Sequence, residues 1–118
     1  MGRALEYFTF QNKATTNSNG NELLTEKSND MFVFDSDILS IEISGTATSG
    51  TTLFEAKVTP DGDFYSVSAV AAHDYNFSTN TNGINEIWLM DISTFYAFRT
   101  RVSGISGGYI TIKGRVSK

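Results

Sequence analysis

Histidine, serine and carboxylate side chains are the groups in this chain that could carry out catalysis. Nucleophilic hydrolysis needs a nucleophile with an adjacent base, which is usually histidine. The 118 residues include one histidine, His73, which stands beside Asp74 in a predicted loop. No serine lies in the strand-turn-helix context of a nucleophile elbow, because the chain shows no sustained helical periodicity. We therefore interpret His73 as a surface residue and predict that the protein is not an enzyme.

Two close pairs of aspartates are candidates for acid chemistry or for a cation site. Glycoside cleavage needs two acids facing each other across a cleft, and Ca²⁺ needs several oxygen ligands. The pairs are Asp35 with Asp37 and Asp61 with Asp63, and both lie in predicted turns, where aspartate favours the turn geometry itself. The chain lacks an EF-hand loop, and the absence of cysteine excludes thiolate sites and disulfides. We predict no metal and no cofactor, with Ca²⁺ on an aspartate pair as the less favoured alternative.

Aromatic side chains suggest a different kind of site. All-β domains often stack sugars on exposed aromatic rings, and the candidates for glycan contact here are Trp88, Tyr65 and Tyr75. Trp88 lies in a strongly apolar stretch, so core packing is the favoured interpretation for that residue. This alternative predicts a carbohydrate-binding module that recognises host-surface glycans.

Charge is distributed unevenly along the chain. Residues 96–118 contain five basic residues and no acid, giving +5, whereas residues 1–95 contain four bases and thirteen acids, giving −9. These values sum to the net charge of −4. An acidic body with a basic end can interact head to tail with its own copies or with a polyanion, although an ordinary solvated strand face is the plainer interpretation. Four exposed bases on an acidic domain are a weak footprint for nucleic acid, so we predict no nucleic-acid partner.

The basic residues fall within the clearest structural pattern of the sequence. Residues 95–102 and 109–116 each alternate with period two, which is typical of half-buried strands. The glycine-rich segment 103–108 between them favours a turn. We predict a closing β-hairpin with Tyr96, Phe98 and Val102 on its inner face and with Ala97 and the basic residues outside. The predicted assembly surface comprises Arg99, Arg101, Tyr109, Lys113 and Arg115.

The rest of the chain predicts further short strands. Alternation predicts a half-buried strand with Leu39, Ile41 and Ile43 on one face, and another with Phe54, Ala56 and Val58 on one face. Residues 5–10 are a candidate first strand, and aromatic content adds one over 31–34. The Pro60–Asp63 turn predicts a second hairpin, with residues 64–72 as the returning strand.

Three segments are less regular. Residues 75–77 predict a short strand, 22–27 either a strand or a helical turn, and 78–85 an exposed polar loop. Residues 87–92 are apolar enough to predict a strand covered on both faces. Together these elements predict an all-β chain with one domain over 1–118. We expect about eight strands in an antiparallel two-sheet β-sandwich or jelly roll.

A series of motifs between Ile43 and Ser117 resembles a β-sandwich module of tailed bacteriophages and prophages. In order along the chain, the matching residues are Ser44-Gly45-Thr46, Ser49-Gly50-Thr51, Phe54-Glu55, Asp61-Gly62, Tyr65, Phe98-Arg99, Arg101-Val102, Gly107-Gly108 and Lys113-Gly114-Arg115. The resemblance covers about two-thirds of the chain and rests on the order and spacing of these motifs.

The resemblance implies a non-enzymatic virion component, namely a capsid decoration protein, a minor capsid protein or a tail accessory protein. Such a protein would assemble with other virion proteins and with itself, as a trimer or larger. No stretch has the roughly 18 apolar residues of a membrane span, and residues 1–6 lack the pattern of a signal peptide. We therefore expect synthesis in the bacterial host cytoplasm, a place in the virion and no membrane partner. We also expect Glu substitution of Arg99 and Arg115 to weaken assembly without unfolding the monomer.

Overall fold

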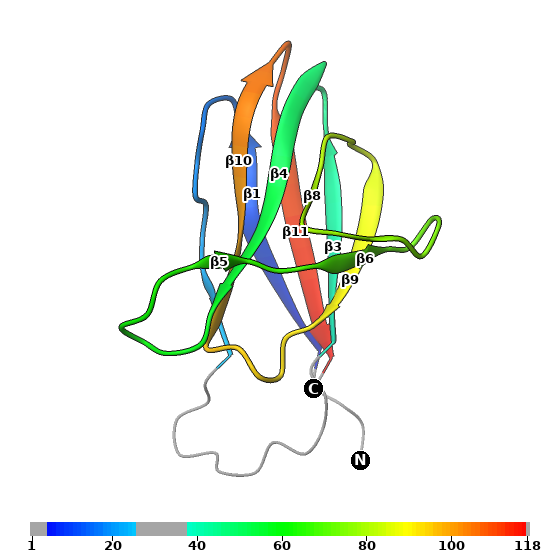
Figure 1. Cartoon of the computed structure of the whole chain (residues 1–118). Helices are drawn as coiled ribbons and strands as arrows, with labels where there is room; N and C mark the ends of the chain where they lie inside the picture. Colours follow the sequence, from blue (N-terminus) through cyan, green and yellow to red (C-terminus); the bar gives the residue numbers. More distant parts are fainter. Residues whose placement is uncertain (1–4, 26–37, 118) are drawn as a thin grey trace.

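Two antiparallel β-sheets packed face to face make up the structure (Figure 1). The computed structural model describes residues 5–25 and 38–117. The six-stranded sheet has the order β1-β11-β3-β9-β6-β7. Its strands are β1 (Leu5–Ala14), β3 (Ile38–Gly45), β6 (Ala69–Ala71), β7 (Phe77–Ser78), β9 (Glu86–Asp91) and β11 (Ile110–Ser117).

The second sheet has the order β2-β10-β4-β5, with one more short strand, β8, also paired with β4. Its strands are β2 (Leu23–Leu24), β4 (Ser49–Lys57), β5 (Tyr65–Ser66), β8 (Asn80–Thr81) and β10 (Ala97–Ser106). We call it the five-stranded sheet. The predicted all-β, two-sheet sandwich is thereby confirmed.

The core lies between the sheets and is built by the alternation seen in the sequence. Leu39, Ile41 and Ile43 of β3 are fully buried, as predicted. From the opposite sheet, Phe54 and Phe98 project into the same core. Phe98 meets Phe10 of β1 edge to face, with ring centroids 5.7 Å apart. Edge-to-face aromatic pairs of this kind add to the stabilisation that burial alone provides.

The predicted closing hairpin is wrong, because its two strands belong to different sheets. β10 pairs with β4 and β2, whereas β11 pairs with β1 and β3. The turn at 107–109 carries the chain from one sheet across to the other. Alternation specifies which face of a strand is buried but not which strand it pairs with. Ala97, predicted outside, is also buried at the start of β10.

The second predicted hairpin is partly correct. Ala56 pairs with Tyr65 and Glu55 with Ser66, so the turn after β4 forms as predicted. The returning strand is nevertheless only two residues long, and the chain then crosses to the six-stranded sheet as β6. Val58 is exposed because β4 ends at Lys57.

The predictions for the remaining short segments also need correction or completion. The segment 78–85 is not purely a loop, because β8 pairs with β4 within it. The strand at 86–91 is covered on one face only, since Ile87 is 51% exposed. The segment 22–27, left open between a strand and a helical turn, contains the strand β2, and the short strand predicted at 75–77 forms at Phe77–Ser78 as β7. Residues 31–37, with the predicted aromatic strand and the Asp35–Asp37 turn, lie outside the described residues.

Candidate interaction surfaces

The predicted basic surface is divided between the two outer faces of the sandwich. Arg99 and Arg101 project outward from β10, in the five-stranded sheet. Lys113 and Arg115 project outward from β11, in the six-stranded sheet. Because the two sheets pack face to face, their outer faces point in opposite directions. The four bases therefore do not form one surface.

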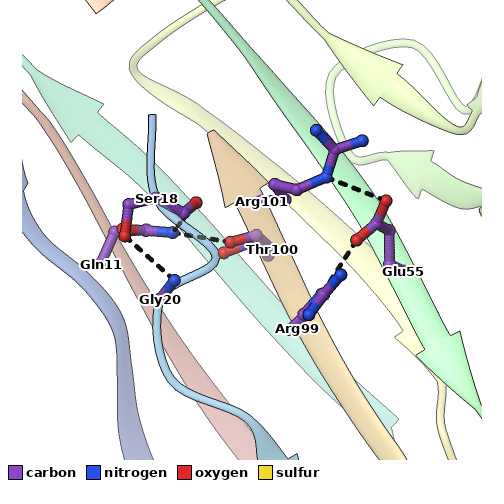
Figure 2. Close-up of polar contacts among 7 residues, drawn as sticks. All are labelled: Gln11, Ser18, Gly20, Glu55, Arg99, Thr100 and Arg101. Carbon is purple, nitrogen blue, oxygen red and sulfur yellow. Dashed lines mark hydrogen bonds and ion pairs between the residues drawn. The ribbon is translucent and has the colours of Figure 1, made fainter. Parts of the chain in front are cut away.

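Arg99 and Arg101 converge on a single carboxylate, that of Glu55 on the neighbouring strand β4 (Figure 2). The Nε atom of Arg99 donates to Glu55 Oε1 at 2.9 Å, and that of Arg101 donates to Oε2 at 3.1 Å. Glu55 is only 7% exposed, so two charged hydrogen bonds compensate its removal from water. The sequence singled out the arginines but not Glu55 as their partner, because their pairing depends on strand register.

Aromatic packing further restrains Arg99. Its guanidinium carbon lies 4.0 Å from the centre of the Phe64 ring, and Lys57 Nζ lies 5.2 Å from the same ring. Contact of a guanidinium with an aromatic face is favourable and orients both groups. Arg99 therefore has a structural role, which changes the expectation that Arg99→Glu would leave the monomer intact.

The outer face of the six-stranded sheet carries one continuous row of directly paired residues. In order across the sheet they are Tyr7, Arg115, Ser40, Leu89, Val70 and Phe77. Arg115 lies over the Tyr7 ring at 5.9 Å. A second row pairs Lys113 with Glu42 and Glu42 with Ile87. This face is thus polar and cationic over β1 and β11 and apolar over β9, β6 and β7.

The apolar half of this face is both exposed and hollowed. Phe77 is 75% exposed, and Ile38 and Ile87 also present large exposed side chains. A hollow of about 370 Å³ lies there; its lining residues are Ile38, Ser68, Val70, Phe77, Leu89, Met90, Asp91 and Phe95. Apolar clusters of this kind on a protein surface mark contact sites for other macromolecules. The sequence did not reveal this site, because its members come from four separate segments.

Tyr109, the remaining member of the predicted assembly surface, lies at the turn that enters β11. Its backbone N–H donates to Thr46 Oγ1 at 3.2 Å, and its carbonyl accepts from the N–H of Thr46 at 2.9 Å. Lys13 Nζ lies 5.5 Å from its ring. These contacts place the Tyr109 ring on the same side of the sandwich as β1, away from Arg99 and Arg101.

The predicted glycan contacts do not form one platform. Trp88 is only 4% exposed and packs on Phe54, with ring centroids 5.1 Å apart. Its Nε1 donates to Glu86 Oε1 at 3.0 Å, so its polar atom is satisfied inside the protein. Tyr65 and Tyr75 are exposed but lie on β5 and in the β6–β7 loop, respectively. Trp88 is therefore a core residue.

His73 and Asp74 are both exposed in the loop after β6, with Nε2 and Oδ2 3.5 Å apart. The backbone N–H of Asn76 donates to Asp74 and holds the pKa of its carboxyl below the ordinary value. A hollow of about 490 Å³ beside His73 is lined by Ala72, His73, Ile84, Asn85, Glu86 and Ile87, with no serine or threonine among them. The residues that line this hollow therefore offer His73 no hydroxyl nucleophile.

The described part of the chain contains neither a metal-binding cluster nor a membrane-spanning helix. Across residues 5–25 and 38–117, no three histidine, aspartate or glutamate side chains gather in a way that could hold a metal ion. Asp61 and Asp63 lie exposed in the β4–β5 turn. Within the same residues, no helix has the length and apolar character needed to cross a membrane.

The fold defines a two-sheet β-sandwich module with an exposed apolar region on the outer face of its six-stranded sheet. The chain belongs to the XepA family, whose sequence model matches residues 4–116. No curated protein matches it significantly.

Two solved structures are similar over 98% of the chain. The SPBc2 prophage-derived protein YomS has 28% sequence identity and a TM-score of 0.84, with 95% of YomS covered. The PBSX exported protein XepA has 26% identity and a TM-score of 0.85, and the chain spans 38% of the length of that protein. The resemblance to a prophage β-sandwich module is thus confirmed, and the comparisons support a phage-associated protein.

Proposed function

We propose that this protein is a non-enzymatic structural or accessory component of a phage particle that acts through protein–protein assembly. The roles that fit are capsid decoration protein, minor capsid protein and tail accessory protein. Its partners are copies of itself, in a trimer or larger ring, and other phage proteins. The family membership and the prophage origin of both structural relatives support the phage association.

The outer face of the six-stranded sheet is the observation that carries this proposal. Its exposed apolar half supplies the buried centre that a stable contact needs, and Arg115 and Lys113, on the far side of β3, supply part of a polar rim. An apolar cluster with a charged rim is the usual anatomy of a protein interface. The outer face of the five-stranded sheet contributes less, because Glu55 pairs with the Nε atoms of both arginines and offsets one of their two charges.

Glycan binding is not proposed as a second function. The burial of Trp88 removes the ring that would stack best on a sugar, and the remaining candidates, Tyr65 and Tyr75, come from separate elements. Particle assembly uses features that the six-stranded sheet brings together, whereas glycan binding would depend on two separated tyrosines.

The double variant Phe77→Ser/Ile87→Ser tests the proposed surface. Both side chains are largely exposed, so we expect the monomer to stay folded while the affinity for other copies falls about tenfold or more. Light scattering after size exclusion, over a range of protein concentrations and at low and high salt, measures this change. An interface centred on apolar side chains should persist in salt, because salt screens only the charged rim.

Tyr65→Ser is the matched control, because Tyr65 is 69% exposed and lies in the other sheet. We expect its mass in solution to equal that of the unmodified protein at every concentration. If the unmodified protein were a monomer throughout, self-assembly would be excluded. If Tyr65→Ser reduced the mass as much as the double variant did, the six-stranded face would lose its assigned role.

A further inference from the structure

A small polar pocket lies beside Arg101, away from the proposed assembly face. It measures about 210 Å³ and is lined by Asn17, Ser18, Asn19, Arg101 and Val102. The segment between β1 and β2 forms one wall and β10 forms the other. No acidic residue is among these lining residues.

The wall formed by residues 17–19 is held in place by several hydrogen bonds. Ser18 and Val102 exchange backbone hydrogen bonds of 3.0 and 2.9 Å, which dock the segment onto β10. The buried side chain of Gln11 donates from Nε2 to the carbonyl of Ser18 at 3.1 Å and to that of Thr100 at 2.8 Å (Figure 2). Asn17 Oδ1 accepts the backbone N–H of Gly104 at 2.9 Å. The pocket is therefore organised before any ligand arrives.

At Asn17 and Ser18, hydrogen bonds occupy the side-chain oxygens as acceptors and leave donors. Asn17 uses its carbonyl oxygen on Gly104, which leaves its amide NH₂ as a donor pair. Ser18 Oγ accepts from the Gly20 N–H, and its own hydroxyl hydrogen remains to donate. Arg101 meets Glu55 through Nε, and its terminal nitrogens point away from that carboxylate (Figure 2).

The positive charge at this pocket also favours a ligand that is anionic and accepts hydrogen bonds. Glu55 is shared between two guanidiniums, so the three side chains together carry one net positive charge. Arg101 is the more exposed of the two arginines, and it is the one that lines the pocket. The pair of terminal nitrogens of a guanidinium matches the two oxygens of a carboxylate.

From this arrangement we propose that the pocket between Asn17 and Arg101 binds a carboxylate group. One carboxylate oxygen pair meets the terminal nitrogens of Arg101, and the Asn17 amide and the Ser18 hydroxyl donate to the same group. The carboxylate can belong to a small free acid or to a glutamate or aspartate side chain of a peptide. The site does not require the assembly surface on the six-stranded sheet and is independent of it.

Asn17→Asp is the sharpest test, because it keeps the acceptor for the Gly104 N–H and replaces the donating amide with a negatively charged oxygen. Asn82→Asp is the matched control, since it makes the same charge change at an exposed asparagine that bonds Thr51 instead. The probes are glutarate, its neutral analogue glutaramide, inorganic phosphate, and a glutamate-containing peptide with its glutamine counterpart. Binding is followed by the NMR shifts of side-chain amide and guanidinium groups.

We expect saturable shifts at Asn17 and Arg101 with glutarate or with the glutamate peptide, and none with the neutral probes. Saturation by glutarate would show that a free carboxylate suffices, whereas saturation by the peptide alone would identify a protein side chain as the source. Asn17→Asp should weaken binding at least about tenfold, and Asn82→Asp should not. Equal shifts from neutral and charged probes, equal binding by Asn17→Asp, or tighter binding of phosphate than of both carboxylates would overturn the proposal.

Discussion

Replacing Arg99 by glutamate is expected to lower the free energy of unfolding by about 3 kcal/mol or more. The change removes the 2.9 Å hydrogen bond to Glu55 and places a second carboxylate beside one that is nearly buried. It also removes the guanidinium from the Phe64 ring. Chemical denaturation of the purified variant measures the loss.

Arg115→Glu provides the comparison, because it makes the same charge change on an exposed strand position of the opposite face. We expect a change in unfolding free energy of about 0.5 kcal/mol or less. If both variants were equally stable, the Glu55 cluster would have no structural role. The experiment also separates two arginines that the sequence alone had grouped on one surface.

Gly45→Ala is expected to have an effect of similar size, costing about 3 kcal/mol or preventing folding. Gly45 ends β3 with φ of 139°, in a region that residues with side chains rarely adopt. A Cβ atom at this position would lie 2.1 Å from the backbone oxygen of Tyr109, which cannot move without disturbing the register between β3 and β11. Thermal and denaturant unfolding of the variant would show the loss.

Gly104→Ala separates the cost of a positive φ from the cost of the steric contact with Tyr109, which together cause the loss expected at Gly45. Gly104 also has a positive φ, 64°, but nothing lies within 4 Å of a Cβ built on it. We expect this variant to lose only about 1–2 kcal/mol, the ordinary penalty of the left-handed conformation. Equal losses at the two positions would show that backbone conformation, rather than the contact with Tyr109, determines the requirement for glycine at 45.

Alternation within single strands was the most informative signal in the sequence. Leu39, Ile41 and Ile43 are buried as predicted, and the Pro60–Asp63 turn forms where turn chemistry placed it. These features depend on neighbouring residues in the chain. Pairing between strands depends instead on residues that are distant in the sequence. The hairpin predicted over 95–116 was wrong for that reason. Each strand has one apolar face, and both faces reach the same core from opposite sheets.

The candidate sites were less predictable than the fold, because they too depend on pairing between strands that are distant in the sequence. Arg99 and Arg101 were identified as unusual, but the register that brings Glu55 between them cannot be derived from their spacing. Phe77, Val70 and Leu89 come from three strands that become neighbours only in the folded sheet. Core packing was the favoured interpretation of Trp88, and its burial against Phe54 confirms that interpretation.

We propose that copies or partners meet on the apolar half of the outer face of the six-stranded sheet. Hydroxyl-radical footprinting of the unmodified protein, dilute and concentrated, measures side-chain exposure on that face directly. The account predicts that oxidation of Phe77 and Ile87 falls as the mass in solution rises, while oxidation of Tyr65 stays constant. Unchanged oxidation of Phe77 and Ile87 in an assembled sample would contradict it and would place the interface elsewhere.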